Sequence, residues 1–532
     1  MLKAKASGLP RFRCGLVGVA AVLALTAGTP APAQLFGRAT VIRNARIVTM
    51  NGPVIERGSI VIKGGVITEI GAEVKAPLLS RTIDAAGKTV TPGFIDAWSA
   101  LGRLGGSRHV DATSNAWDAF DRYARDDFRE ALRRGVTSIY IGAASAPGIS
   151  GTGVVVQLVP GKGRSAGKVL KEDAALCVDL GSGQKAVARM KTFRDLRKKF
   201  LTAQEYRKSL EDYEEDLEEY LKELKKLREE KESAEGDEKD DSESGEEDDG
   251  PSEDDEPVPS PDEDEDGDDE GGDEKLARGY AATYSSDAGS SRARRRSAEG
   301  NGDDDKKDEK SDEEDDEKKD DDELKKPEKP KFDATSKLLL RAIDHELSLR
   351  IHAHRSADIL NALELADEFN LDIVLEGATD AYLVADRIAD ADVPVVLGQV
   401  VRTDVFERNE FRRHTIRNAA ALSKAGVRWT VGSGAGDANA SRFVAQNAQL
   451  AWSRGVRDNM SSSGGPNWMR TVTLDAAAVL GLSSRIGVLK SGTQADLAIW
   501  DGAPGDPSSK VVRVLVAGKT AYLAPKSTGG GS

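Results

Sequence analysis

Hydrophobic and polar residues alternate with a period of two near both ends of the chain. Residues 34–90 and 487–525 contain short runs of this kind, separated by glycine and proline, which is typical of β-strands joined by turns. Gly64-Gly65 lies between two of these runs and predicts the tip of a hairpin. We expect both ends to meet in one composite β-sandwich, followed by a flexible tail over residues 526–532.

Between these ends, strand-like and helix-like segments alternate, which predicts a parallel α/β domain in two parts, residues 91–192 and 332–486. Glycine-rich runs at residues 151–153 and 161–163 flank the strand-like segment 154–159 and predict hairpin turns. Further strands are expected at residues 136–141, 348–353, 372–376, 394–398 and 428–432, and helices at residues 119–134, 356–369, 382–391 and 417–425.

The middle of the chain departs from this alternation. Residues 193–231 are rich in lysine, glutamate and leucine, and their apolar residues recur at helical spacing. They predict one long amphipathic helix or a helical hairpin that packs on the α/β domain. Residues 232–331 are almost all charged residues, serine, glycine and proline, so we expect a disordered acidic insertion. The insertion lacks the spaced aspartates and closing glutamate of a calcium-binding hand.

Charge and termini limit the partners and the location. The formal net charge of −16 argues against nucleic acid and anionic membrane surfaces as partners. A basic stretch, an apolar run at residues 15–27 and small residues at 31–33 predict a signal peptide over residues 1–33. We expect export to the periplasm or beyond, without stable membrane insertion after cleavage; an uncleaved anchor is the alternative. Cys177 would then be the sole cysteine, which excludes an intramolecular disulfide.

The chain has only 5 histidines, which limits the candidates for a metal site. We interpret His109, His345 and His414 as surface or structural residues. His352 and His354 are two positions apart at the C-terminal end of a predicted strand, so both imidazoles lie on one face of it. In α/β barrels this end of a strand carries the functional loops. The pair is therefore a candidate for binding a zinc-type metal.

Four segments resemble the amidohydrolase superfamily, in particular its imidazolonepropionase-like members. They are residues 92–96, which read Pro-Gly-Phe-Ile-Asp, and residues 351–360, 371–382 and 487–497. The resemblance implies a (β/α)8 barrel of the TIM type, flanked by the composite β-sandwich. It also implies hydrolysis of a non-peptide carbon–nitrogen bond, in which one or two divalent metals, usually zinc, activate a water molecule.

Measured against that family, most metal-ligand positions are substituted. Where the resemblance implies a His-x-His pair, this chain has Trp98 and Ala100. It has Gly377 where a further histidine is implied, and Gly434 where an aspartate is implied. Only the pair His352 and His354 remains, and Asp437, Glu376 or Asp380 could supply a substitute carboxylate. We expect Asp96 to have a structural role at its strand end.

Two functions remain open. The first is a degenerate amidohydrolase, without a cofactor, that keeps the barrel mouth as a pocket for a small molecule. Such a protein could form a homo-oligomer or pair with an intact amidohydrolase paralogue. The alternative is an active hydrolase of a cyclic amide or dipeptide-like molecule, with a single zinc or other divalent metal on His352, His354 and a non-standard carboxylate. Asp437 is then the candidate catalytic carboxylate and Glu376 a further metal ligand.

Overall fold

The chain divides into two compact units, residues 1–212 with 329–532, and residues 213–328. The predicted signal peptide, His109, residues 161–163, the C-terminal tail and most of the acidic insertion lie outside the described residues. The computed structural model describes residues 38–103, 112–143, 146–159, 166–237, 324–402, 409–434, 436–456 and 466–525.

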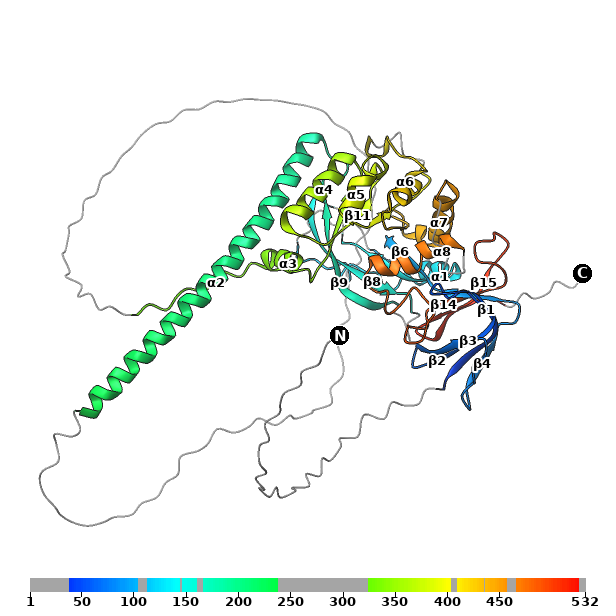
Figure 1. The fold of residues 1–532 in the computed structure, drawn as a ribbon, viewed down its shortest axis with the longest axis horizontal. Helices are drawn as coiled ribbons and strands as arrows, with labels where there is room; N and C mark the ends of the chain where they lie inside the picture. The colour runs from blue at the N-terminus through cyan, green and yellow to red at the C-terminus, as the bar shows by residue number, and fades with distance from the viewer. Residues whose placement is uncertain are drawn as a thin grey trace, which may run out of the picture. The chain divides into compact units, whose positions relative to one another are not determined.

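Both ends of the chain contribute to one eight-stranded sheet (Figure 1). The N-terminal strands are β1 (Thr40–Ile47), β2 (Ile55–Lys63), β3 (Val66–Gly71), β4 (Arg81–Asp84) and β5 (Thr89–Pro92), and the C-terminal strands are β14 (Leu497–Trp500), β15 (Val511–Val516) and β16 (Lys519–Leu523). β14 pairs antiparallel with β5, so the prediction that the two ends meet is confirmed. Gly64 and Gly65, both with positive φ, form the predicted hairpin tip between β2 and β3.

A second eight-stranded sheet forms a nearly closed barrel whose strands follow chain order. They are β6 (Phe94–Ser99), β7 (Val136–Ile141), β8 (Gly148–Gln157), β9 (Lys168–Asp179), β10 (Leu349–Ala353), β11 (Ile373–Gly377), β12 (Val395–Leu397) and β13 (Trp429–Val431). The predicted barrel with a flanking sheet is confirmed, with one difference: β8 runs antiparallel to β7 and β9. The connections on either side of β8, residues 142–147 and 158–167, are too short for a parallel crossover.

The glycines at 151 and 153 lie inside β8, so the turn predicted there is wrong. A Cβ atom on Gly153 would lie 2.3 Å from the Tyr140 hydroxyl oxygen. One on Gly151 would lie 2.2 Å from the backbone oxygen of Ser114. Glycine is therefore needed for close approach of neighbouring atoms, which local sequence does not distinguish from a turn.

A backbone bridge and the Asp96 side chain complete the closure of the barrel between β6 and β13. Ser99 and Gly434 form an isolated parallel bridge, and the Gly434 N–H donates to Trp98 O at 2.9 Å. Asp96, fully buried, accepts hydrogen bonds from the Ser433 N–H and from the hydroxyls of Ser433 and Ser441. Desolvation raises the pKa of Asp96 despite these donors. Asp96 lies inside β6, and its contacts link β6 to the residues that follow β13.

Helices cover the outside of the barrel. α4 spans the predicted residues, whereas the helix predicted from residue 119 begins only at Arg125. Before it, the Asp121 carboxylate accepts from the Tyr123 N–H in a turn (2.7 Å). The helices are α1 (Arg125–Arg133), α3 (Ala334–Ile343), α4 (Ser356–Phe369), α5 (Ala385–Asp390), α6 (Asn418–Ala425), α7 (Val444–Ser453), α8 (Asn467–Thr471) and α9 (Leu474–Val479), with 3-10 turns η1 (Ala381–Leu383), η2 (Asn409–Phe411) and η3 (Ala438–Phe443).

Residues 193–231 lie within one continuous helix, α2 (Ala186–Asp237) (Figure 1). Leu196, Phe200 and Ala203 on its first half are buried in the core of the first unit, where the Phe200 ring stacks on Phe369 at a centroid distance of 5.1 Å. Among the described residues, no helix is both long enough and apolar enough to cross a membrane.

Candidate functional site

A cavity of about 1150 Å³ lies at the mouth of the barrel. Its walls come from the C-terminal ends of β6, β9, β10, β12 and β13 and from the residues that follow them. This is the end of the strands at which barrels of this type carry their chemistry. The residues relevant to function in its lining are Trp98, Arg103, Lys185, His352, His354, Arg355, Arg402, Glu410, Ser433, Gly434 and Asp437.

His352 and His354 both line this cavity, as their spacing on one strand face predicts. Their rings are perpendicular, with centroids 4.6 Å apart. His352 is partly exposed, whereas His354 is buried. His354 Nδ1 lies 2.8 Å from the Thr379 hydroxyl, and its ring packs edge-on against Phe411. The surroundings fix the orientation of His354 more tightly than that of His352.

Trp98 occupies the side of the mouth where the resemblance implies a metal-binding histidine. Its indole is 7% exposed and packs against the His352 ring at a centroid distance of 5.2 Å. A Cβ atom on Gly398 would lie 3.0 Å from Trp98 Cζ3, and one on Gly432 would lie 2.5 Å from Trp98 Cβ. The two neighbouring strand ends therefore carry glycine where Trp98 needs room. Ala100, the other substituted position, is also buried.

A buried ion pair lies inside the barrel below the mouth. Arg350 on β10 donates from Nε to Glu376 Oε1 on β11 at 2.6 Å, and its Nη2 donates to Ala97 O at 2.7 Å. The guanidinium lies over the Tyr140 ring, 4.2 Å from its centroid. Tyr140 Oη is 3.3 Å from Cys177 Sγ, and burial raises the pKa of both groups, that of Cys177 to about 11. Arg103 and Asp179 line a small pocket beside this ion pair, so further charged groups lie close to it.

The sequence-based search for ligands missed Arg350. A signal was present, because Arg350 is two residues before His352 and shares its strand face. An arginine on that face had to point into the barrel and find a counter-ion there. Its counter-ion, Glu376, was instead considered as a metal ligand.

The three substitute carboxylates are each engaged elsewhere. Glu376 is paired with Arg350. Asp380 accepts from the Ser356 N–H at the start of α4, and Asp437 is exposed and accepts from the Asn439 N–H at the start of η3. Among the described residues, no cluster of three or more histidine, cysteine, aspartate or glutamate side chains could hold a metal. The two imidazoles alone do not fit the metal that the family resemblance implies.

The backbone at Gly377 and Gly434 also differs from what a ligand-bearing residue would need. Both have positive φ, of 83° and 87°. A Cβ atom on Gly377 would lie 2.5 Å from Cε1 of His354, so a side chain there would displace that ring. Gly434 has open space for a Cβ atom, but its conformation is one that other residues adopt at a cost.

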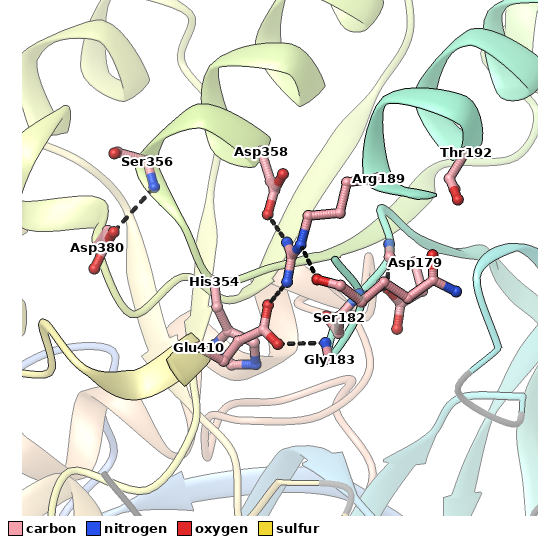
Figure 2. A network of polar contacts seen from close by, with 12 residues as sticks. Asp179, Ser182, Gly183, Arg189, Thr192, His354, Ser356, Asp358, Asp380 and Glu410 are labelled. Carbon is pink, nitrogen blue, oxygen red and sulfur yellow. Dashed lines mark hydrogen bonds and ion pairs between the residues drawn. The ribbon is translucent and has the colours of Figure 1, made fainter. Parts of the chain in front are cut away.

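A buried network holds one side of the cavity rim together (Figure 2). Arg189, in the first turn of α2, pairs with Asp358 of α4 and with Glu410 of η2, both buried. Glu410 also accepts a hydrogen bond from the Gly183 N–H. In the same segment after β9, the Asp179 carboxylate accepts from the Gly181 and Ser182 N–H groups. The network ties α2, α4, η2 and the segment after β9 into one structure beside His354.

The other described histidines, His345 and His414, do not line this cavity. His345 is exposed, with Nδ1 3.1 Å from the Asp372 carboxylate and its other ring nitrogen 3.0 Å from Asn370 Nδ2. His414 is half-buried and lines a small pocket that adjoins the cavity, since His354, Gly398 and Arg402 line both. The site therefore consists of His352 and His354 among the residues that the sequence singled out, with Trp98, Gly434 and Asp437 on the same cavity.

Comparison with known proteins agrees with this architecture. The profile of the amidohydrolase family matches residues 288–523. A crystal structure of an amidohydrolase from Thermotoga maritima is similar in fold, with a TM-score of 0.58, 21% sequence identity, and coverage of 91% of this chain and 100% of that one.

An imidazolonepropionase from Sphingopyxis alaskensis is 52% identical over 46 residues. This match covers 9% of this chain and 11% of the relative's length. The family profile spans less than half of this chain, and the Thermotoga maritima structure shows that the fold is similar to that of an amidohydrolase.

Proposed function

We propose that this chain is a degenerate amidohydrolase that binds a small molecule at the barrel mouth and has weak or no hydrolytic activity. The observation that carries the proposal is the buried pair of Arg350 and Glu376. A guanidinium already supplies the positive charge inside the barrel and occupies a carboxylate that could have joined the two histidines. Bringing a divalent cation close to Arg350 would add repulsion between like charges in a poorly solvated interior.

The cavity itself supports a binding role. At about 1150 Å³ it is large enough for a small organic molecule. Its lining combines an indole and a phenyl ring with charged groups of both signs, among them Lys185, Arg355 and Asp437. Such a lining favours a polar ligand with an apolar part, which hydrogen bonds and ion pairs orient.

The alternative function is a single-metal hydrolase, and one observation favours it. His352 and His354 face the same cavity as Asp437, which is exposed at the start of η3. A movement of that loop would be needed to bring the carboxylate to the imidazoles. The substrate would be a cyclic amide or a dipeptide-like molecule, as the sequence resemblance implies.

Metal content decides between the two. The protein without residues 1–33 is produced in medium supplemented with zinc and manganese and analysed by elemental mass spectrometry. The binding function predicts no metal above background in the parent protein or in the H352A/H354A double variant. Near-stoichiometric metal that is lost in H352A/H354A but retained in the surface control His345→Ala would overturn it in favour of the hydrolase.

We also propose that the protein is exported, on the strength of the basic and apolar pattern in residues 1–33. N-terminal sequencing of the protein from a periplasmic or culture fraction tests this. A mature N-terminus close to Gln34 is expected, and an intact N-terminus in a membrane fraction would favour the uncleaved anchor.

A further inference from the structure

The second half of α2 carries a regular apolar seam. α2 is one continuous helix, and from residue 206 its large apolar side chains recur at alternating intervals of three and four residues. This is a heptad repeat, with leucine at one seam position and tyrosine or leucine at the other. The residues of this α2 seam are Tyr206, Leu210, Tyr213, Leu217, Tyr220, Leu224 and Leu227.

The α2 seam is separate from the face by which α2 joins the core of the first unit. At 3.6 residues per turn, its mean direction is rotated by roughly a quarter turn from Leu196, Phe200 and Ala203. Those three side chains are buried, whereas Leu227 is 52% exposed and the seam residues before it are only partly covered. In the described part of the second unit, α2 is the only helix and no strand is present. Within that part, no second helix or strand packs on the seam.

We propose that the α2 seam pairs with the α2 seam of a second copy of this chain in a parallel two-stranded coiled coil. A seam with a strict three-and-four spacing fits another helix that has the same spacing, because each side chain then inserts between four residues of the facing helix. A second copy supplies such a helix by definition.

Charges beside the seam favour the parallel arrangement. In a parallel, in-register pair, Glu223 of one copy lies next to Arg228 of the other, twice by symmetry, and Asp216 lies next to the uncharged Leu221. In the antiparallel arrangement that places Leu217 opposite Tyr220 and Tyr213 opposite Leu224, Asp216 lies next to Glu223 twice. The first arrangement gains two opposite-charge contacts, and the second brings together two pairs of like charges.

The segment that follows α2 is poor in the apolar side chains that a seam of this kind needs. Residues 238–323 contain a single leucine, Leu276, and no isoleucine, phenylalanine or methionine. The apolar side chains that the seam needs are thus available from a second α2 and not from the acidic segment that follows it.

The mass of the full chain in solution tests the proposal. We expect sedimentation equilibrium to give about twice the mass of one chain for the parent protein and a single-chain mass for Leu217→Glu, which puts a charge into the middle of the seam. The matched control is Leu201→Glu, the same change at an exposed leucine of α2 outside the seam, and it should keep the double mass. A single-chain parent protein, or a Leu217→Glu variant that keeps the double mass, would overturn the proposal.

Disulfide cross-linking tests the orientation independently of stability. In a Cys14→Ser background the native Cys177 is buried, so an introduced cysteine is the accessible thiol. Leu217→Cys should form a disulfide-linked dimer under mild oxidation, because equivalent seam residues adjoin in a parallel pair. Glu215→Cys, on the opposite side of the helix, should not. Equal cross-linking of both variants, or none in either, contradicts the parallel coiled coil.

Discussion

The two sides of the barrel mouth differ in what their side chains do. At the β6–β13 side, Trp98 fills the space above Gly398 and Gly432, and Asp96 is fully buried among hydroxyl donors. At the β10 side, His352 is partly exposed, lines the cavity and, among the described residues, makes ring contacts with Trp98 and His354. One side has become part of the packed core, whereas the other keeps a polar surface toward the cavity.

At the mouth of this barrel, the side chains that pack the core and the side chains that face the cavity thus lie on different sides. Residues that close the barrel are under a packing constraint, so the side chains there fill space. A residue that faces the cavity gains little from packing. The stabilities of variants on the two sides should differ accordingly.

The largest effect is expected from the ion pair beneath both sides. Arg350→Met should reduce the free energy of unfolding by about 3–5 kcal/mol, because it leaves Glu376 buried without its counter-ion. The double variant R350M/E376L should recover most of that loss. Urea unfolding measures both, with Arg428→Met, an arginine in an exposed ion pair, as the control that stays within about 1 kcal/mol. A small effect of Arg350→Met would mean that water already solvates Glu376.

Trp98→Ala tests whether the β6–β13 side is part of the core. Removing a buried indole should cost about 3 kcal/mol, since the glycines around it cannot fill the space. Trp98→Phe should cost less, because a phenyl ring keeps part of the packing. Thermal and urea unfolding measure both variants. A loss below about 1 kcal/mol for Trp98→Ala would place the indole in the cavity and not in the core.

The base of β6 provides a pH-dependent test of the same side. Asp496 accepts from Gln157 Nε2 at 2.6 Å and from the Ala517 N–H at 2.7 Å, and its carbonyl accepts from the Gly93 N–H just before β6. Desolvation raises its pKa from 3.8 to about 6. The folded protein therefore holds this proton more tightly than the unfolded chain does, so stability falls as pH rises from about 4 to about 6 and then levels off.

The expected loss from this group is about 3 kcal/mol over that interval. Asp496→Asn should remove it, because the amide stays neutral at every pH in the range. The exposed Asp390→Asn serves as the control and should leave the slope unchanged. Urea unfolding at a series of pH values gives the difference between the two variants, and equal slopes would show that Asp496 ionises in the folded state as it does in the unfolded chain.

Local patterns were sufficient for the elements and for the pair of histidines. The helix at residues 356–369 and the strand at residues 136–141 have the predicted bounds, because periodicity depends on neighbours in the sequence. The interior of the site could not be predicted in this way. Arg350 contacts Ala97 and Tyr140, which are far away in sequence, and the glycines of β8 are set by Tyr140 and Ser114. Such contacts depend on the closed barrel.

The smallest effect is expected at the β10 side. His352→Ala should change the free energy of unfolding by less than about 1 kcal/mol, since the ring is partly exposed and has no hydrogen bond of its own among those that hold the barrel. His354→Ala should cost more, because it removes a buried ring that packs on Phe411 and contacts Thr379. Urea unfolding of both variants beside the parent protein measures the difference. If His352→Ala cost as much as Trp98→Ala, both sides of the mouth would be structural, and the reason to assign His352 to a ligand would be gone. If it costs little, His352 has no large stabilising role, as the proposed binding function expects of a residue that faces the cavity.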